Sequence, residues 1–345
     1  MKKYIKKNRV FIIAEAGVNH NGNLSLAKRL VDVAKEAGCD AVKFQTFKAD
    51  QLVSKHAGLA EYQKKDRGPG SKNQYELIRK LELSFEQFRE LKVYCDQKEI
   101  IFLSTPFDFE SADRLTQLRV PIFKLSSGEI TNVPFLEYVA KKGKPIILST
   151  GMSSLAEVKG AVKAIYHCRN KNLVLLHCTT QYPTPFSEVN LRAMDTLSKV
   201  FNIPVGYSDH TLGIEVAVAA VARGASVIEK HFTLDRNLSG PDHKASLEPE
   251  ELKEMVTSIR NIEKSLGDGI KKPAECEQKN IAIVRKSLVA ARRISKGELI
   301  TNDHVAIKRP GYGIAPENLS KVIGLKARID IDEDEVFQWK QIIKG

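Results

Sequence analysis

The 345-residue chain lacks paired cysteines, long apolar runs and a glycine-rich nucleotide loop of the G-x-G-x-x-G type. Its five cysteines are widely spaced and include no Cys-x-x-Cys pair, which indicates reduced thiols rather than a disulfide framework. No run approaches the about 20 apolar residues of a membrane span. The N-terminal run VFIIA is too short for the core of a signal peptide, and Glu15 follows it directly. We therefore expect a cytoplasmic protein that does not enter membranes.

The net charge of +12 has two interpretations. Lysines can simply solvate the surface, as in KKNR near the start, or their field can attract anionic substrates or nucleic acid. We favour the first interpretation. The chain has no zinc-finger spacing and no basic stripe interleaved with aromatic residues, so we expect no nucleic-acid partner.

Short apolar runs alternate with helical patterns along most of the chain. The runs span residues 10–15, 40–45, 100–105, 122–127, 145–150, 173–179, 203–209 and 226–232. Most are nearly continuous, which is typical of parallel strands covered on both faces. Eight alternations within about 260 residues predict a (β/α)8 TIM barrel. An open doubly wound sheet is the alternative, but it usually carries a Gly-rich phosphate turn where this chain has AEAGVNHNGN.

Helix starts support this pattern. Ser84 with Gln87, and Ser154 with Glu157, have the spacing of a capping box. Pro249 stands at the start of an amphipathic stretch, where its missing N–H costs nothing.

The alternation of apolar runs and helical patterns ends near residue 266. Residues 267–285 are polar and without clear periodicity, and we interpret them as a linker. Residues 286–345 have short strand patterns and many turns, which predicts a small β-rich module. At about 60 residues this module is small for a domain that stands alone. We expect a barrel over residues 1–266 and a C-terminal domain that packs against another protein surface.

Polar side chains stand at the carboxyl end of every predicted strand, where barrel enzymes have their active sites. For any single residue, proximity to solvent explains this equally well. The set is more informative because it combines carboxylate, ammonium, hydroxyl and imidazole groups. It comprises Glu15, Lys43, Gln45, Ser104, Thr105, Lys124, Ser126, Ser127, Glu129, Ser149, Thr150, His177, Thr179, Thr180, Tyr182, Ser208, Asp209, His210, Glu229, Lys230 and His231.

Lys43 and Lys124 have two interpretations. With the nearby hydroxyls they suit a phosphate and a carboxylate. A lysine in a barrel can instead form a Schiff base, but that needs an apolar pocket that depresses its pKa. We favour anion binding and keep the aldolase as an alternative.

His210 and His231 each follow a short apolar run, and a helical pattern separates them. In a βαβ unit both imidazoles emerge at the same edge of neighbouring strands, where they suit a divalent transition metal. Buried histidines with a purely structural role are the alternative. His20 lies in the first loop and suits either a ligand or a turn, whereas His56, His167 and His304 are interpreted as surface or packing residues.

Several segments together resemble the sialic acid synthase family, which includes N-acetylneuraminate and N,N'-diacetyllegionaminate synthases. They are IAEAGVNHNG (13–22), VKFQTFKAD (42–50), FLSTPFD (102–108), FKLSSGEITNVPFL (123–136), ILSTGM (147–152), LLHCTTQYPTPFSEVNL (175–191), GYSDHTLG (206–213), IEKHFTLDRNLSGPDHKASL (228–247) and KRPGYGI (308–314). The resemblance covers nearly the whole chain. It implies a TIM barrel followed by an antifreeze-like SAF domain of the β-clip type. It also implies a transferase that condenses phosphoenolpyruvate (PEP) with N-acetylmannosamine to N-acetylneuraminate and phosphate, or alternatively uses 2,4-diacetamido-2,4,6-trideoxymannose.

The resemblance also implies roles for individual residues. Mn²⁺ or Mg²⁺ would be held by His210 and His231, with Glu15 beside the reacting centre. PEP would be bound by Lys43, Thr105, Lys124, Ser127, Ser149 and Ser208. The amino sugar would be bound by Gln45, Glu129, Tyr182 and Asp242. Arg309 would reach the active site of the partner protomer in a domain-swapped homodimer.

Two departures bear on the sugar. Some members have Asn in place of Thr180 and an aromatic residue in place of Ile283. The run GDGIKKPAECEQKNIAIVRKSLVA resembles the legionaminic acid branch.

Overall fold

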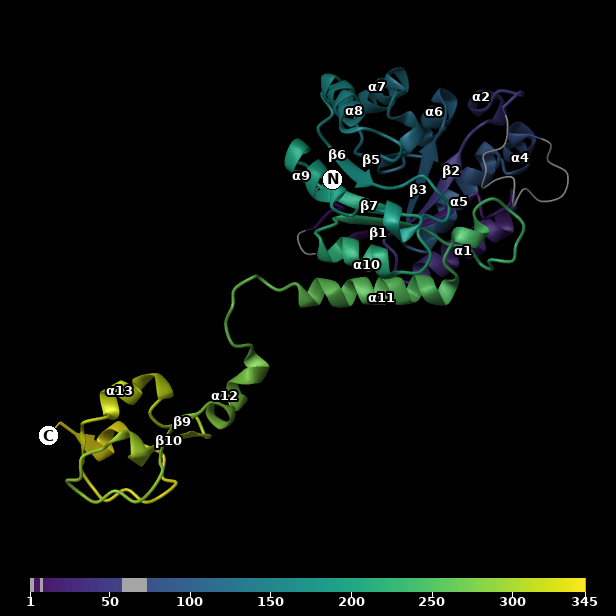
Figure 1. The fold of residues 1–345 in the computed structure, drawn as a ribbon. Coiled ribbons are helices and arrows are strands. Elements are labelled where there is room, and N and C mark those ends of the chain that lie inside the picture. The colour runs from purple at the N-terminus through teal and green to yellow at the C-terminus, as the bar shows by residue number, and fades with distance from the viewer. Residues whose placement is uncertain (1–2, 7–8, 58–72, 345) are drawn as a thin grey trace. The chain divides into compact units, whose positions relative to one another are not determined.

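The computed structural model describes residues 3–6, 9–57 and 73–344. Within them, eight parallel strands form one sheet in the order β3-β2-β1-β8-β7-β6-β5-β4, and β4 lies beside β3, so that the sheet nearly closes (Figure 1). The strands are β1 (Phe11–Gly17), β2 (Ala41–Thr46), β3 (Ile101–Pro106), β4 (Phe123–Leu125), β5 (Ile146–Ser149), β6 (Leu173–His177), β7 (Val205–Asp209) and β8 (Val227–His231). Each overlaps one predicted run, and the barrel prediction is confirmed.

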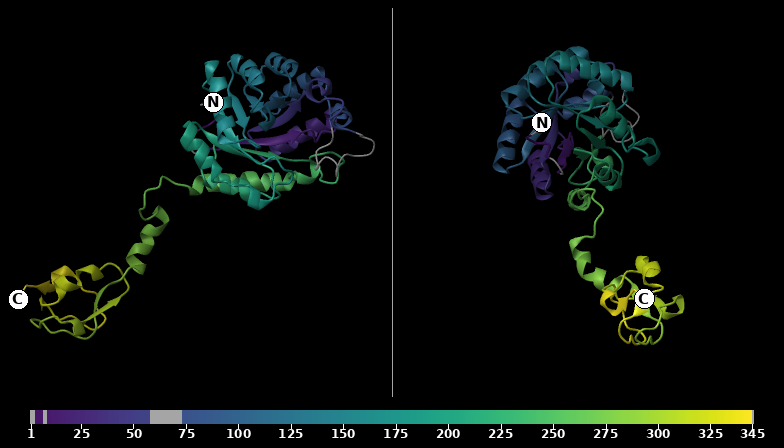
Figure 2. Two further views of the ribbon diagram at one scale, coloured as in Figure 1. Left: turned by 45° about the horizontal axis from the view of Figure 1, so that its top comes forward. Right: turned by 90° about the vertical axis from the view of Figure 1, so that its left-hand side faces the viewer.

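Helices surround the strands (Figure 2). They are α1 (Leu24–Glu36), α2 (Ala49–Leu52), α4 (Gln74–Lys80), α5 (Phe85–Gln97), α6 (Phe109–Gln117), α7 (Val133–Lys141), α8 (Leu155–His167), α9 (Ala193–Phe201), α10 (Glu215–Ala222) and α11 (Pro249–Ser265). Both predicted capping boxes form, at Ser84 of α5 and Ser154 of α8. Pro249 is the first residue of α11, as expected.

The strands are apolar on both faces because they separate two cores. Alternate residues point to opposite faces of a strand. Ile13, Leu103 and Ile147 belong to a cluster inside the barrel. Ile12 and Phe102 belong to a larger cluster with the helices. This arrangement explains the continuous apolar runs and leaves only the strand ends for polar groups.

The chain divides into two compact units, Met1–Gly267 and Asp268–Gly345. The second unit contains α12 (Gln278–Val284), β9 (Ser287–Ala290), β10 (Val305–Lys308), α13 (Leu319–Val322), β11 (Lys326–Ala327) and β12 (Ile342–Ile343), around its own apolar core. Helix α12 lies in the segment expected to be an irregular linker. It is seven residues long and buries none of them, which is too short for an apolar period to show in the sequence.

Among the described residues, no helix combines the length and apolarity needed to cross a lipid bilayer. The GPGSK motif at 68–72 lies outside the described residues.

Candidate active site

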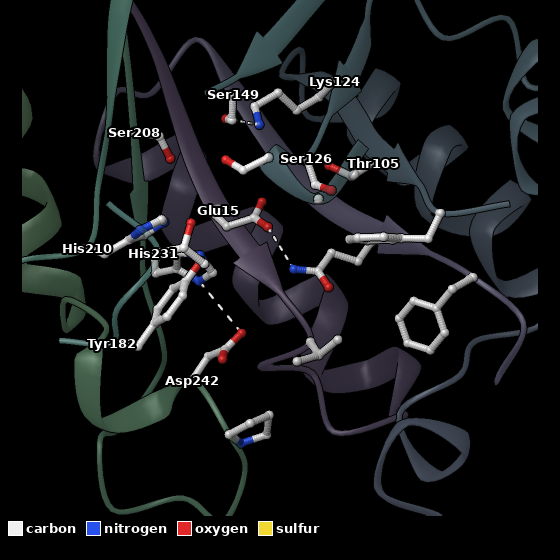
Figure 3. Close-up of a pocket in the computed structure, with 18 of the residues that line it drawn as sticks. Glu15, Thr105, Lys124, Ser126, Ser149, Tyr182, Ser208, His210, His231 and Asp242 are labelled. Atoms are coloured by element: carbon white, nitrogen blue, oxygen red, sulfur yellow. Dashed lines mark hydrogen bonds and ion pairs between the residues drawn. The ribbon is translucent and has the colours of Figure 1, made fainter. Parts of the chain in front are cut away.

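A cavity of about 400 Å³ opens at the carboxyl ends of the barrel strands (Figure 3). It brings together twelve of the residues predicted for the site: Glu15, Lys43, Gln45, Thr105, Lys124, Ser127, Ser149, Tyr182, Ser208, His210, His231 and Asp242. They come from all eight strands or the segments that follow them. The strand-end argument therefore locates most of this cavity from sequence.

Two buried lysines meet two buried carboxylates on one wall. Lys43 Nζ lies 2.7 Å from Glu15 Oε2 and 3.7 Å from Glu229 Oε2. Lys124 Nζ lies 3.5 Å from Glu229 Oε1 and donates to Ser149 Oγ at 2.7 Å. Glu229 thus lies between two ammonium groups.

The pKa values on this wall follow from burial and neighbouring charge. Burial disfavours charged Lys43, but Glu15 and Glu229 outweigh burial and raise its pKa. Burial, together with repulsion from Lys43, lowers the pKa of Lys124. Burial would raise the pKa of Glu229, but Lys124 and Lys43 lower it. The ammonium form of Lys43 is therefore favoured on this wall, although the carboxylates beside it offset part of its charge.

Hydroxyl groups surround the lysines. Lys43 Nζ donates to Thr105 Oγ1 at 3.1 Å. Ser208 Oγ donates to Glu229 Oε1 at 3.0 Å. A Schiff-base lysine needs an apolar pocket, whereas both lysines here contact hydroxyl and carboxylate oxygens. The geometry favours anion binding over the aldolase.

Glu15 occupies the centre of the cavity (Figure 3). Burial raises its pKa to about 7, and Lys43 opposes that rise. Gln45 Nε2 donates to Glu15 Oε1 at 3.2 Å and so orients the carboxyl group. A carboxyl group with a pKa near neutrality can both take and give a proton.

His210 and His231 lie together, with ring centroids 5.5 Å apart. Their proximity follows from the βαβ geometry, because β7 and β8 are parallel neighbours joined through α10. The ring of Tyr182 lies 4.2 Å from that of His210 and 5.6 Å from that of His231. The predicted juxtaposition of the two imidazoles is present.

The donor atoms of the pair fit a metal ion. His210 Nδ1 donates to the carbonyl oxygen of Thr179 at 2.6 Å, which leaves Nε2 as its acceptor. His231 Nδ1 is buried without a hydrogen-bond partner and lies 3.8 Å from Asp242 Oδ2. Burial lowers the pKa of both histidines, so both are neutral and able to ligate.

Within the described residues, no group of three or more His, Cys, Asp or Glu side chains is placed to hold a metal. The two neutral imidazoles would suit an ion that takes its remaining ligands as oxygen atoms from water or substrate.

A buried network fixes the loop that carries His210. Lys230 Nζ donates to Asp209 Oδ2 at 2.8 Å and to the carbonyl oxygen of Thr211 at 2.6 Å. The backbone N–H and the hydroxyl of Thr211 both donate to Asp209 Oδ1. Lys230 and Asp209 are fully buried, so this pairing orients the loop without facing the cavity.

Two predicted residues do not line the cavity. Glu129 is buried in the turn after β4, where its Oε2 accepts a hydrogen bond from Asn132 Nδ2 at 2.7 Å. Arg309 belongs to the second unit, where it is exposed.

The other histidines lie elsewhere. His20 is buried outside the cavity lining, and its Nδ1 accepts from the N–H of Gly22. His304 is buried in the second unit, and its Nδ1 accepts from the N–H of Thr301. His56 and His167 are exposed, as expected.

Glu229 has no assigned role in the sequence prediction beyond its place among the polar strand ends, yet it contacts both lysines. The sequence carried the signal: Glu229 and His231 are two residues apart on one strand, so they point to the same face. The cavity also has apolar lining from residues such as Phe47, Leu77 and Phe107, which strand-end reasoning does not reach.

Comparisons with known proteins agree with this geometry. The model of the NeuB family matches residues 30–271, and that of the SAF domain matches residues 285–343. The N,N'-diacetyllegionaminic acid synthase of Campylobacter jejuni is 52% identical, over 96% of this chain and 99% of that protein. The N-acetylneuraminate-9-phosphate synthase of Homo sapiens is 40% identical, over 95% of this chain and 91% of that protein.

Among solved structures, the N-acetylneuraminic acid synthetase of Leptospira borgpetersenii in complex with citrate matches with a TM-score of 0.70 and 38% identity. The matched region covers 80% of this chain and 92% of the Leptospira chain. The resemblance drawn from the sequence motifs is confirmed. The chain belongs to the NeuB family and ends in a SAF domain.

Proposed function

We propose that the protein is a nonulosonic acid synthase, a transferase that joins PEP to an N-acetylated amino sugar and releases phosphate. The carrying observation is that one cavity combines a wall of lysines and hydroxyls with a neighbouring pair of neutral imidazoles. The wall of lysines and hydroxyls suits the phosphate and carboxylate of PEP. The imidazole pair suits a metal beside a sugar carbonyl.

On the anion wall, Lys43 and Lys124 supply positive charge, and Thr105, Ser127, Ser149 and Ser208 supply hydroxyl groups. The ammonium groups are already held by buried partners, so little reorganisation is needed when phosphate charge develops. This preorganisation supports binding of PEP and stabilisation of the departing phosphate.

His210 and His231 would hold the divalent ion. Two imidazole donors favour Mn²⁺ over Mg²⁺, which prefers oxygen ligands. When bound, the ion supplies Lewis-acid polarisation of the sugar carbonyl.

The proposed reaction forms one C–C bond and breaks one C–O bond. C3 of PEP forms a bond to C1 of the open-chain sugar, whose carbonyl oxygen takes a proton and becomes a hydroxyl. Water adds to C2 of the PEP unit and loses one proton. The tetrahedral intermediate then expels phosphate by C–O cleavage. Its C2 hydroxyl gives its proton to the departing phosphate, which leaves a 2-keto acid. Glu15 is our choice for the proton or water step, because it lies at the centre of the cavity beside Lys43.

Gln45, Tyr182 and Asp242 line the same cavity and would contact the sugar, Tyr182 and Asp242 from beside the imidazole pair. Glu129 would need to turn from Asn132 to take part. Arg309 would come from the partner protomer of a domain-swapped homodimer.

N-acetylmannosamine is the first candidate sugar. The 2,4-diacetamido-2,4,6-trideoxymannose is the second, favoured by the 52% identity to the Campylobacter diacetyllegionaminic acid synthase.

Phosphate release from PEP with Mn²⁺ tests the proposal on both sugars. We expect release with at least one of them, and loss of activity on adding EDTA. Activity that survives EDTA, with covalent trapping of the substrate by borohydride, would instead identify a Schiff-base aldolase.

A further inference from the structure

The two neighbouring strands that lead to His210 and His231 carry opposite charges one residue before each imidazole. Asp209 is the last residue of β7, Lys230 is the penultimate residue of β8, and the two are register partners in this parallel pair. Alternate residues of a strand point to opposite faces. The imidazoles line the cavity, so Asp209 and Lys230 point away from it, toward the helices.

The face of the sheet that carries this ion pair is otherwise apolar. Val205 and Tyr207 of β7 and Ile228 of β8 share that face, and all three belong to the core cluster between strands and helices. Lys230 Nζ lies 2.8 Å from Asp209 Oδ2, and both side chains are 0% exposed. Removing two charges from water is costly, and uncharged residues of similar volume are often as stable or more stable. The stability of the fold therefore does not account for the pair.

The ammonium group of Lys230 contacts the chain on both sides of His210. It donates to Oδ2 of Asp209, which precedes His210, and at 2.6 Å to the carbonyl oxygen of Thr211, which follows it. The N–H and the hydroxyl of Thr211 donate to Asp209 Oδ1 at 2.9 and 2.8 Å. Lys230 also directly precedes His231 in the chain. One buried ammonium group thus joins the two backbone segments that carry the imidazoles.

The separation of the imidazoles depends on these backbone segments. The ring of His210 is held by the carbonyl oxygen of Thr179, but Nδ1 of His231 is buried without a hydrogen-bond partner. No hydrogen bond at Nδ1 therefore holds the His231 ring in place if its strand shifts. A binding site requires its groups within about 0.5 Å of the productive geometry, so a small slip between β7 and β8 is enough to disturb the pair.

We propose, on the basis of the metal role given under the proposed function, that Asp209 and Lys230 are positioning residues for the divalent ion. Their ion pair fixes the register of the two strand ends and so holds the imidazoles at the separation that one ion requires. Neither residue lines the cavity, so neither contacts the ion or the substrates. The pair therefore acts on metal affinity. It does not act on PEP binding, because Lys43 and Lys124 belong to β2 and β4.

The double variant Asp209→Asn/Lys230→Met tests this inference without leaving one charge buried alone. Electron paramagnetic resonance of free Mn²⁺ measures the affinity of the full chain for the ion. We expect a dissociation constant at least about tenfold higher than that of the unmodified chain, the usual loss when a residue that orients a metal ligand is replaced. The melting temperature in EDTA should stay close to that of the unmodified chain, and calorimetry without metal should give an unchanged affinity for PEP.

Asp40→Asn/Arg260→Met is the matched control. Arg260 Nη2 lies 2.8 Å from Asp40 Oδ2, and both side chains are mostly buried. Asp40 directly precedes β2, at the end of the strand opposite the cavity. Loss of this pair should alter stability alone, and the Mn²⁺ affinity of the folded control should equal that of the unmodified chain.

Thr211→Val is the milder variant to use if the double variant does not fold. Valine keeps the shape of threonine but lacks the hydroxyl that donates to Asp209 Oδ1. With Co²⁺ in place of Mn²⁺, we expect severalfold weaker binding and a changed visible absorption spectrum, which reports the arrangement of ligands around the ion. An unchanged spectrum together with unchanged affinity would overturn the inference.

The outcomes separate this inference from the proposed function. Unchanged Mn²⁺ affinity in the folded double variant would overturn the positioning role and leave the synthase proposal standing. A lower melting temperature in that variant would then identify the pair as purely structural. Weaker Mn²⁺ binding would support the positioning role even if no sugar released phosphate, which would overturn the synthase proposal. Absence of Mn²⁺ binding by the unmodified chain would overturn both the metal role and this inference.

Discussion

At the scale of single residues, His231 combines a buried ring with an unpartnered atom. Its Nδ1 makes no hydrogen bond, so the ring contributes little polar bonding to the fold. We expect His231→Ala to lower metal-dependent phosphate release by at least about 100-fold, the usual scale for a group in a metal-assisted step. The melting temperature without metal should change little.

His167→Ala is the control, because His167 is exposed at the end of α8. Full activity of His231→Ala would rule out a metal role for the pair. A large loss of stability would favour the structural interpretation instead.

Two other histidines make folding depend on pH. Burial lowers the pKa of His20 to about 4 and that of His243 to about 4, from an ordinary value of 6.5. Between pH 6.5 and 4 the unfolded chain therefore binds protons that the folded chain does not, so stability falls as the pH falls through this window. Each group contributes on the order of 1.4 kcal/mol per unit of pKa difference.

Chemical denaturation at several pH values measures this dependence. We expect His20→Asn to reduce the slope of stability against pH between 6.5 and 4, whatever its effect at pH 8. His167→Gln, which replaces an exposed ring, is the matched substitution control. A slope equal to that of the unmodified chain in His20→Asn would refute the assignment.

At the scale of secondary-structure elements, the capping box of α8 has a measurable role. The N–H of Glu157 donates to Ser154 Oγ, and the N–H of Ser154 donates to Glu157 Oε2. Ser154→Ala removes an N-cap acceptor, which typically costs about 1 kcal/mol. Urea unfolding should show that loss, whereas Ser198→Ala, on the exposed face of α9, should change stability much less.

The strands and most helices could be predicted because their signals are local. The buried strand β5 lies within the apolar run 145–150, and the capping-box pair Ser154 and Glu157 marks the start of α8 in the sequence. The position of the cavity then follows from barrel topology. The spacing of Glu229 and His231 places Glu229 in the cavity, but its contacts depend on the closing of the barrel. The barrel brings Lys43 of β2 and Lys124 of β4 to Glu229 although neither strand pairs with β8, so no single segment reveals these contacts.

The sequence did not reveal the apolar part of the cavity lining, for a similar reason. Leu52 and Leu77 lie in short helices, where an apolar residue normally indicates packing. Only the fold shows that these side chains face a cavity lined by Glu15 and His231.

At the scale of the whole molecule, the two compact units pose the question of where Arg309 acts. A guanidinium group offers paired donors suited to a carbonyl or carboxylate oxygen. If it completes the sugar site, Arg309→Ala should raise KM for the sugar at least about tenfold, which is the loss of one charge-assisted hydrogen bond. KM for PEP should change little. Lys308→Ala, beside it in the sequence and also exposed, is the control.

Mixing two impaired variants, assayed at a sugar concentration well below KM, tests whether Arg309 acts in the partner protomer. In a hybrid dimer of Arg309→Ala with His231→Ala, the barrel of the first variant keeps its histidines and receives Arg309 from the second. Subunit exchange at equal concentrations should therefore restore about a quarter of full activity, because half of the dimers are hybrids and each has one complete site. If Arg309 acts within its own chain, every hybrid site lacks one of the two groups and the mixture stays at the level of the separate variants. A monomeric protein in sedimentation experiments would also contradict the swapped arrangement.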